Sequence, residues 1–201
     1  MKLEPTEARY GAGLTLPTSC AVAFKEWAGV CDALMTGRQS LILRKGGVAE
    51  TSGEFRPDYP AFWLYPTIVH QAEQGLRTPT PPLLYDPRFV SIEALAVVEW
   101  TGRVDRLDQL AALSDWHDWT ESTIQGRFQY RKPGLWALVV RVYLRGEAIP
   151  VAVTTKQLGC KTWVPLESAI PTEGVRGVVE DVESTRRLSL IRQALGWGGA
   201  A

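Results

Sequence analysis

The sequence predicts an α+β fold, and three observations lead to this expectation. An amphipathic segment with helical spacing lies near the N-terminus, several apolar segments of strand length follow it, and a second amphipathic segment closes the chain. Strands and helices do not alternate regularly, which argues against a doubly wound parallel sheet. With 201 residues, 45% hydrophobic and 22% charged, the chain has the size and composition of one globular domain, or of one domain with an appendage.

The N-terminal part is expected to contain an arm, a helix and two strands. Residues 1–17 mix glycine, proline and charge without a period, which predicts a flexible arm. Residues 20–35 carry apolar side chains at three- and four-residue steps after Thr18 and Ser19, which are good N-cap residues, and Gly37 is a typical stop. Short apolar runs predict strands at 40–43 and 61–65, the second halted by Pro66.

Later segments predict four strands and three helices. An extended proline-rich connector is expected from Arg77 to Pro87. Residues 135–144 are apolar on both faces, so this strand is expected in the interior of the sheet. The other expected strands span 89–100, 148–154 and 161–166, and the expected helices span 105–113, 121–128 with Thr120 as its cap, and 178–197.

Charge and cysteine content exclude several classes of protein. The 22 basic residues are balanced by 22 acidic ones, which argues against a polyelectrolyte that coats nucleic acid. No apolar run reaches the length of a membrane-spanning helix and no signal peptide is evident, so a cytoplasmic, bacterial-type protein with no membrane partner is expected. Three cysteines without CxxC spacing predict neither a metal site nor a disulfide framework, and no cofactor is expected. Cys160, beside Lys161, is expected to be structural rather than nucleophilic.

Seven short motifs resemble an uncharacterised bacterial family with a domain-of-unknown-function label. The resemblance covers residues 20–170 and implies no activity. The motifs are Phe24–Trp27, Leu43–Gly47, Leu64–Thr67, His70-Gln71, Arg127-Phe128, Arg141–Tyr143 and Gly159–Trp163.

A more distant resemblance is to ASCH domains, which belong to the PUA-like barrel group. A helix ending before Gly37–Ser40, a short strand and Arg44 are similar to the opening of these domains, and the later element order also agrees. The resemblance implies a small mixed β-barrel over 18–170 and binding of RNA or a modified nucleotide. The helix expected near the C-terminus then forms a helical extension at 171–201. Some ASCH members resemble amidohydrolases that use a lysine and a threonine. Gln39 and Ile42 stand at the corresponding positions, which weighs against that mechanism.

Two segments without acidic residues, 35–49 and 124–146, predict a basic surface for phosphate if they meet in the fold. Tryptophan and tyrosine near such a surface would provide stacking for bases. The alternative is that these cations form ion pairs with Glu26, Glu50, Glu99 and Asp118. The expected ligand-binding residues are Arg38, Arg44, Lys45, Tyr65, Trp119, Arg127 and Lys132.

The two histidines, His70 and His117, are the candidates for acid–base chemistry. Asp115 and Asp118 flank His117, and an oriented imidazole base there would fit a hydrolase acting on a nucleoside-like or phosphate-bearing substrate. His70 is more simply explained by a structural hydrogen bond. A third hypothesis is a domain that docks a protein partner through tryptophan. The sequence leaves the oligomeric state open.

Overall fold

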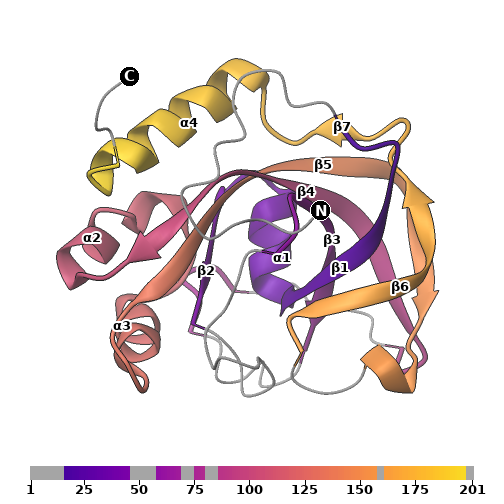
Figure 1. Ribbon diagram of the computed structural model, residues 1–201, viewed down its shortest axis with the longest axis horizontal. Helices are drawn as coiled ribbons and strands as arrows, with labels where there is room; N and C mark the ends of the chain where they lie inside the picture. Colours follow the sequence, from indigo (N-terminus) through magenta and orange to yellow (C-terminus); the bar gives the residue numbers. More distant parts are fainter. Residues whose placement is uncertain (1–15, 46–57, 69–74, 80–85, 158–160, 198–201) are drawn as a thin grey trace.

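The computed structural model describes residues 16–45, 58–68, 75–79, 86–157 and 161–197. These residues form an α+β fold, as the sequence predicts (Figure 1). The strands are β1 (Ser19–Trp27), β2 (Leu41–Arg44), β3 (Ala61–Thr67), β4 (Phe89–Val104), β5 (Leu135–Ala152), β6 (Trp163–Pro171) and β7 (Arg176–Gly177). The helices are α1 (Ala28–Met35), α2 (Leu107–Ala111), α3 (Glu121–Gln129) and α4 (Asp181–Ala194), with short 3₁₀ turns at Ser114–Trp116 and Thr155–Gln157.

One seven-stranded mixed sheet dominates the structure, in the order β2-β5-β4-β3-β1-β6, with β7 added to β5. β1 and β3 run parallel, and the other neighbours are antiparallel. The sheet curls around α1 (Figure 1), but within the described residues no pairing joins its edges β2 and β6. It is therefore an open sheet rather than the closed barrel expected from the ASCH resemblance.

The expectation that residues 135–144 form an interior strand is confirmed. Residues 136–139 of β5 pair with β2 on one side and with β4 on the other. β5 continues to Ala152, so the separate strand expected at 148–154 is the second half of this long strand. β3 likewise runs through Pro66 to Thr67 instead of stopping before the proline.

The prediction of one helix over residues 20–35 is wrong in its first half. Ser19–Trp27 is β1, which pairs with β3 and β6, and only Ala28–Met35 is helical. Ala23 and Phe24 are both fully buried, but they belong to core clusters on opposite faces of the sheet, as alternating strand residues do. Burial on two faces overrides the local helical spacing, because sheet pairing satisfies the backbone on both sides of β1.

The larger core cluster lies between the inner face of the sheet and the helices. α1 is buried along most of its length, and α4 contributes Ile191 and Leu195 to the same cluster. α3 begins as predicted, with the Thr120 side chain accepting a hydrogen bond from the Thr123 N–H. In the described part of the chain, no helix combines the length and apolarity needed to span a membrane.

Candidate functional site

A buried carboxylate lies where the two edges of the sheet approach each other. The Glu26 side chain, on β1, has no exposed surface. Its Oε1 accepts a hydrogen bond from the Trp27 N–H (2.8 Å), and its Oε2 lies 3.3 Å from Nη1 of Arg44, the last residue of β2. Nη2 of Arg44 donates to Oγ1 of Thr162, just before β6 (2.9 Å). Arg44 thus connects the two edges through its side chain where backbone pairing does not.

A second guanidinium, that of Arg127 on α3, lies between two indole rings. Its Cζ is 3.9 Å from the ring centroid of Trp27 and 4.5 Å from that of Trp119. Arg127 interacts electrostatically with Glu26 and Arg44, and burial lowers its pKa to about 10. It donates no hydrogen bond to any residue that the structure describes. Two cations therefore share one carboxylate, and one of them has unused donors. Arg44, Arg127, Glu26, Trp27 and Trp119 are called the Arg44–Arg127 site below.

Aromatic rings extend from Arg44 toward the surface. The Arg44 guanidinium lies over the ring of Phe24 (5.0 Å), which contacts Trp163 edge-on with centroids 4.8 Å apart. Trp163 in turn contacts Tyr59 (5.0 Å), and both of these rings are partly exposed. A planar group bound beside Arg44 would therefore find aromatic neighbours.

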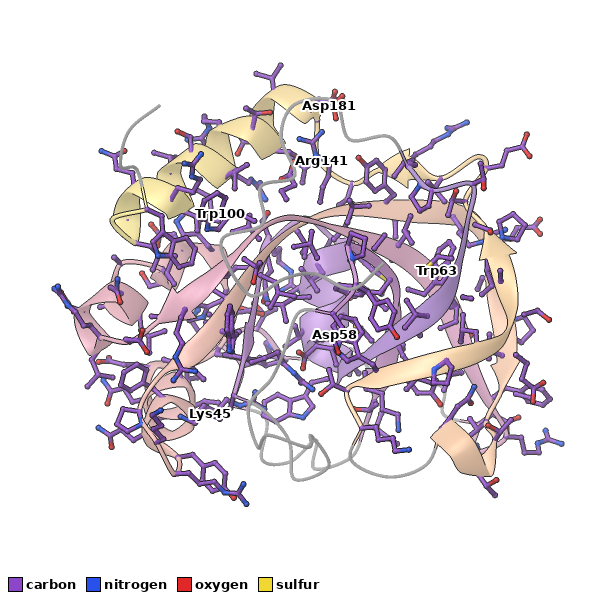
Figure 2. All side chains as sticks on the ribbon, in the orientation of Figure 1. Lys45, Asp58, Trp63, Trp100, Arg141 and Asp181 are labelled. Carbon is purple, nitrogen blue, oxygen red and sulfur yellow. The ribbon has the colours of Figure 1, made fainter. Side chains whose placement is uncertain are left out.

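Lys45 fixes the segment that follows α3. Its ammonium donates to the carbonyl oxygens of Phe128 (2.8 Å), Lys132 and Gly134 (2.8 Å). Lys45 lies between the end of β2 and α3 (Figure 2). Because the Lys45 ammonium donates to three backbone carbonyls, its role is structural. Lys132, expected to bind ligand, is exposed in the segment that Lys45 secures.

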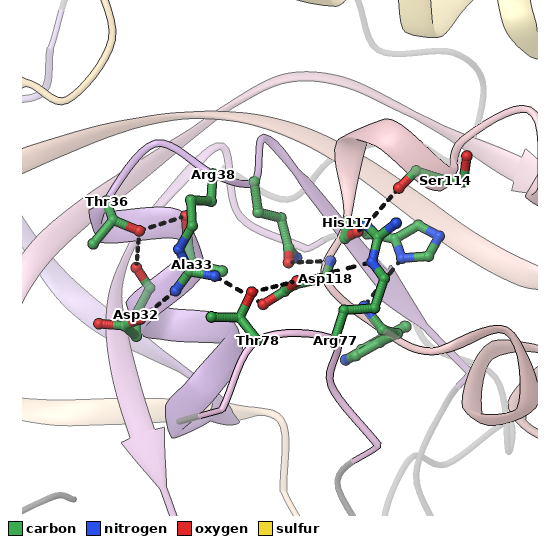
Figure 3. Close-up of polar contacts among 11 residues, drawn as sticks. Asp32, Ala33, Thr36, Arg38, Arg77, Thr78, Ser114, His117 and Asp118 are labelled. Carbon is green, nitrogen blue, oxygen red and sulfur yellow. Dashed lines mark hydrogen bonds and ion pairs between the residues drawn. The ribbon is translucent and has the colours of Figure 1, made fainter. Parts of the chain in front are cut away.

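Arg38 belongs to a different cluster, which is centred on Asp118 (Figure 3). Nη1 of Arg38 lies 2.8 Å from Oδ2 of Asp118, and its Nη2 pairs with Asp32. Asp118 Oδ1 also accepts from the Thr78 hydroxyl (3.1 Å), and Arg77 lies 3.9 Å away. These contacts join α1 to residues 77–78 and 114–118, so Arg38 and Asp118 satisfy each other.

His117 is buried and does not have the surroundings of a general base. Its Nδ1 accepts the backbone N–H of Trp119 (3.2 Å), which leaves the proton of the neutral ring on Nε2. Nε2 is buried without a partner in the described structure. Burial, with the nearby charge of Arg77, lowers the His117 pKa to about 4. Asp115 is exposed and Asp118 faces Arg38, so neither carboxylate orients the ring. His70 lies outside the described residues, as does Cys160.

Two of the expected ligand-binding aromatics are buried. Trp119 is 2% exposed, so its ring supports Arg127 from the core and does not present a face to a base. Tyr65 is 4% exposed and belongs to the core cluster on the other face of the sheet, with the Lys25 ammonium over its ring. The sequence identified both rings but could not show on which side of the sheet they lie.

The structure brings Arg44 and Arg127 together, one from each acid-free segment. The alternative prediction, that these cations form ion pairs, holds at three of the four named carboxylates. Glu26 pairs with Arg44, Glu99 with Arg141 and Asp118 with Arg38. Glu50 lies outside the described residues. Ion pairing therefore accounts for Arg38, Arg44 and Arg141. Arg127 differs from them, because its contacts are with rings.

Among the described residues, no three His, Cys, Asp or Glu side chains are grouped so that they could hold a metal ion. The family model for a domain of unknown function, DUF1802, matches residues 23–189. The chain belongs to the DUF1802 family. No curated protein is significantly similar to this DUF1802 chain.

Solved structures of ASCH from Zymomonas mobilis are similar to this DUF1802 chain. The ASCH crystal structure has 15% sequence identity and a TM-score of 0.37, with 84% of this chain and 92% of that chain covered. A mutant of the same protein, with a serine replaced by alanine, has 12% identity and a TM-score of 0.37, with 87% and 99% covered.

Sequence reasoning missed Glu26 and Trp27 as parts of the Arg44–Arg127 site. Both belong to the Phe24–Trp27 motif of the DUF1802 resemblance. Trp27 lies within the helix expected over residues 20–35, and Glu26 is expected only as an ion-pair partner. In the structure β1 ends at Trp27, which places its ring against Arg127. The sequence feature that could have identified them is the motif itself, which places an acidic residue next to a tryptophan.

Proposed function

We propose that this chain is a binding module for RNA or a modified nucleotide, and that the Arg44–Arg127 site receives a phosphate of the ligand. The observation that carries the proposal is Arg127, which is stacked between Trp27 and Trp119 with no hydrogen-bond acceptor among the described residues. A half-buried guanidinium without an acceptor is costly, and a phosphate oxygen would satisfy it with charge-assisted hydrogen bonds.

Charge balance supports the same proposal. Arg44 and Arg127 carry two positive charges around the single carboxylate of Glu26. The remaining positive charge matches one phosphodiester, which carries one negative charge. Partly exposed Tyr59 and Trp163 near Arg44 would supply the aromatic lining on which bases stack.

The hydrolase hypothesis receives no comparable support. A base with a pKa of about 4 is a weak proton acceptor at neutral pH, and the Nδ1 of His117 is already engaged by a backbone N–H. Binding, rather than catalysis by His117, is therefore the function we propose.

Fluorescence anisotropy with a short labelled single-stranded RNA at low salt tests the proposal. The variant Arg127→Met keeps much of the side-chain volume between the two indoles and removes the charge and the donors. We expect it to weaken binding about tenfold, the equivalent of about 1.4 kcal/mol. Arg186→Met is the matched control, since Arg186 is an exposed arginine on α4 paired with Glu183.

The outcome is decided by the comparison of these two variants. Parent-like affinity of Arg186→Met together with weak binding of Arg127→Met supports the phosphate site. If the parent protein does not bind RNA at low salt, or if the two variants lose the same affinity, the proposal is wrong.

A further inference from the structure

We infer that the ligand is a single strand of several nucleotides, which continues from the Arg44–Arg127 site over Tyr130 and Arg131. These two residues and Lys132 are called the α3 exit loop. The inference rests on the proposed function and extends it from one phosphate to a path along the surface. It assigns Tyr130 as a base-stacking residue and Arg131 as a second phosphate contact.

The loop is continuous with the Arg44–Arg127 site through two connections. It directly follows α3, the helix that carries Arg127. It is also secured by Lys45, the residue after Arg44, whose ammonium donates to the carbonyl oxygen of Lys132 in the loop and to those of Phe128 and Gly134 on either side of it. A strand that leaves Arg127 along α3 therefore reaches the loop next.

The α3 exit loop presents an aromatic ring and a cation at the surface. Tyr130 is 55% exposed, among the largest exposures of an apolar ring in the described chain. The Arg131 guanidinium lies over this ring, 5.1 Å from its centroid. Exposed rings and guanidinium planes are the surfaces on which unpaired bases stack, so this pair offers a stacking platform in an arrangement that already exists.

The local charge favours a polyanion. From Ser122 to Gly146 the sequence has no acidic residue. Arg131 has no carboxylate partner among the residues that the structure describes. The Asp105 carboxylate, which lies beside Gly134, is itself paired with Arg103. Arg131 is therefore able to accept a phosphate without first breaking an ion pair with a described carboxylate.

The backbone of the loop is held in an uncommon conformation. Arg131 has a φ of 59°, the left-handed region, and it is the one non-glycine residue with a positive φ in the described structure. A glycine would occupy this conformation more readily than an arginine. The contacts of Lys45 maintain the turn, so the Arg131 side chain stays beside Tyr130. A mononucleotide bound at Arg127 would leave this platform unused, whereas a strand would use both.

The test compares labelled oligouridines of two lengths, a dinucleotide and a decanucleotide, by fluorescence anisotropy. With each affinity divided by the number of phosphodiesters in the strand, the parent protein should bind the decanucleotide about tenfold more tightly than the dinucleotide, because stacking on an aromatic ring contributes roughly 1 to 3 kcal/mol per base. Tyr130→Ala and Arg131→Gly should each remove most of this gain and leave dinucleotide binding unchanged.

Phe89→Ala is the matched control. Phe89 is also exposed (43%) and lies beneath an arginine, Arg88, at 5.6 Å, but at the start of β4, where it pairs with Ala152 at the end of β5. Equal affinity of the parent protein for the two lengths, or equal losses in Tyr130→Ala and Phe89→Ala, would overturn the inference. In those cases, dinucleotide binding that is lost in Arg127→Met would show that the proposed phosphate site is correct although the inference about the loop is wrong. If the parent protein binds neither length, the proposed function itself is wrong.

Discussion

Replacement of Glu26 by glutamine should destabilise the protein and make it more responsive to phosphate. The amide of the introduced glutamine would still present an oxygen to the Trp27 N–H, but the charge that Arg44 and Arg127 share would be gone. Loss of one partner of a fully buried ion pair costs roughly 3 to 5 kcal/mol. The Arg44 side chain is 20% exposed and keeps its bond to Thr162, so we expect a loss of about 2 to 3 kcal/mol.

Phosphate should recover part of this loss, because an anion would then be the main counter-charge for two guanidiniums. At a concentration of ten times its dissociation constant, phosphate stabilises the folded state by about 1.4 kcal/mol. Urea unfolding followed by tryptophan fluorescence, in phosphate and in chloride of the same ionic strength, measures both effects. The parent protein controls for the general action of phosphate on folded proteins. An equal phosphate-induced shift in the parent and in Glu26→Gln would refute the assignment of the Arg44–Arg127 site as an anion site.

Three further predictions concern residues around the site. His117 has a folded pKa of about 4, below the ordinary value near 6.5, so the unfolded chain takes up the proton first. The contribution of His117 to the free energy of unfolding is therefore complete above pH 6.5 and falls by about 3 kcal/mol as the pH drops to 4. His117→Asn should make the unfolding free energy, measured by urea titration, depend less on pH. An unchanged pH profile would show that His117 does not cause this dependence. Arg131→Gly should change the unfolding free energy by less than about 0.5 kcal/mol, because relief of the left-handed strain offsets the entropy of glycine; a loss above about 1 kcal/mol would mean that the side chain supports the fold. Lys45→Met should cost about 2 kcal/mol, since its ammonium bonds three partly exposed carbonyls, and should speed amide hydrogen exchange in residues 130–134; unchanged exchange there would contradict the anchoring role of Lys45.

Elements whose structure is set locally could be predicted from the sequence. The continuous apolar run of β5 predicts an interior strand, and Thr120 predicts the beginning of α3. β1 could not be predicted in the same way, because its apolar residues have helical spacing and its strand conformation depends on β3 and β6, which are distant in sequence. The open form of the sheet also depends on long-range pairing.

The charged residues of the candidate site could be predicted from the sequence, but the burial and ring contacts of its aromatic residues could not. The two acid-free segments do bring Arg44 and Arg127 together around Glu26. Burial of Trp119 could not be deduced, because residues 115–118 are mostly polar and the contacts of its ring with Trp27 and with Arg127 of α3 join residues that are distant in sequence from one another. The same ring contact distinguishes Arg127 from arginines such as Arg38, which have similar sequence surroundings and are fully paired.

The salt dependence of RNA binding tests most directly whether Arg127 contacts a phosphate. For a single strand, each neutralised phosphate contributes a slope of about −0.7 to a plot of log affinity against log salt concentration. With one phosphate at the Arg44–Arg127 site and one at Arg131, the parent protein should show a slope of roughly −1.4, and Arg127→Met should show a slope that is shallower by about 0.7, with lower affinity at every salt concentration. Parallel lines for the parent and Arg127→Met would contradict the account, because they would show that the Arg127 charge releases no counterion when RNA binds.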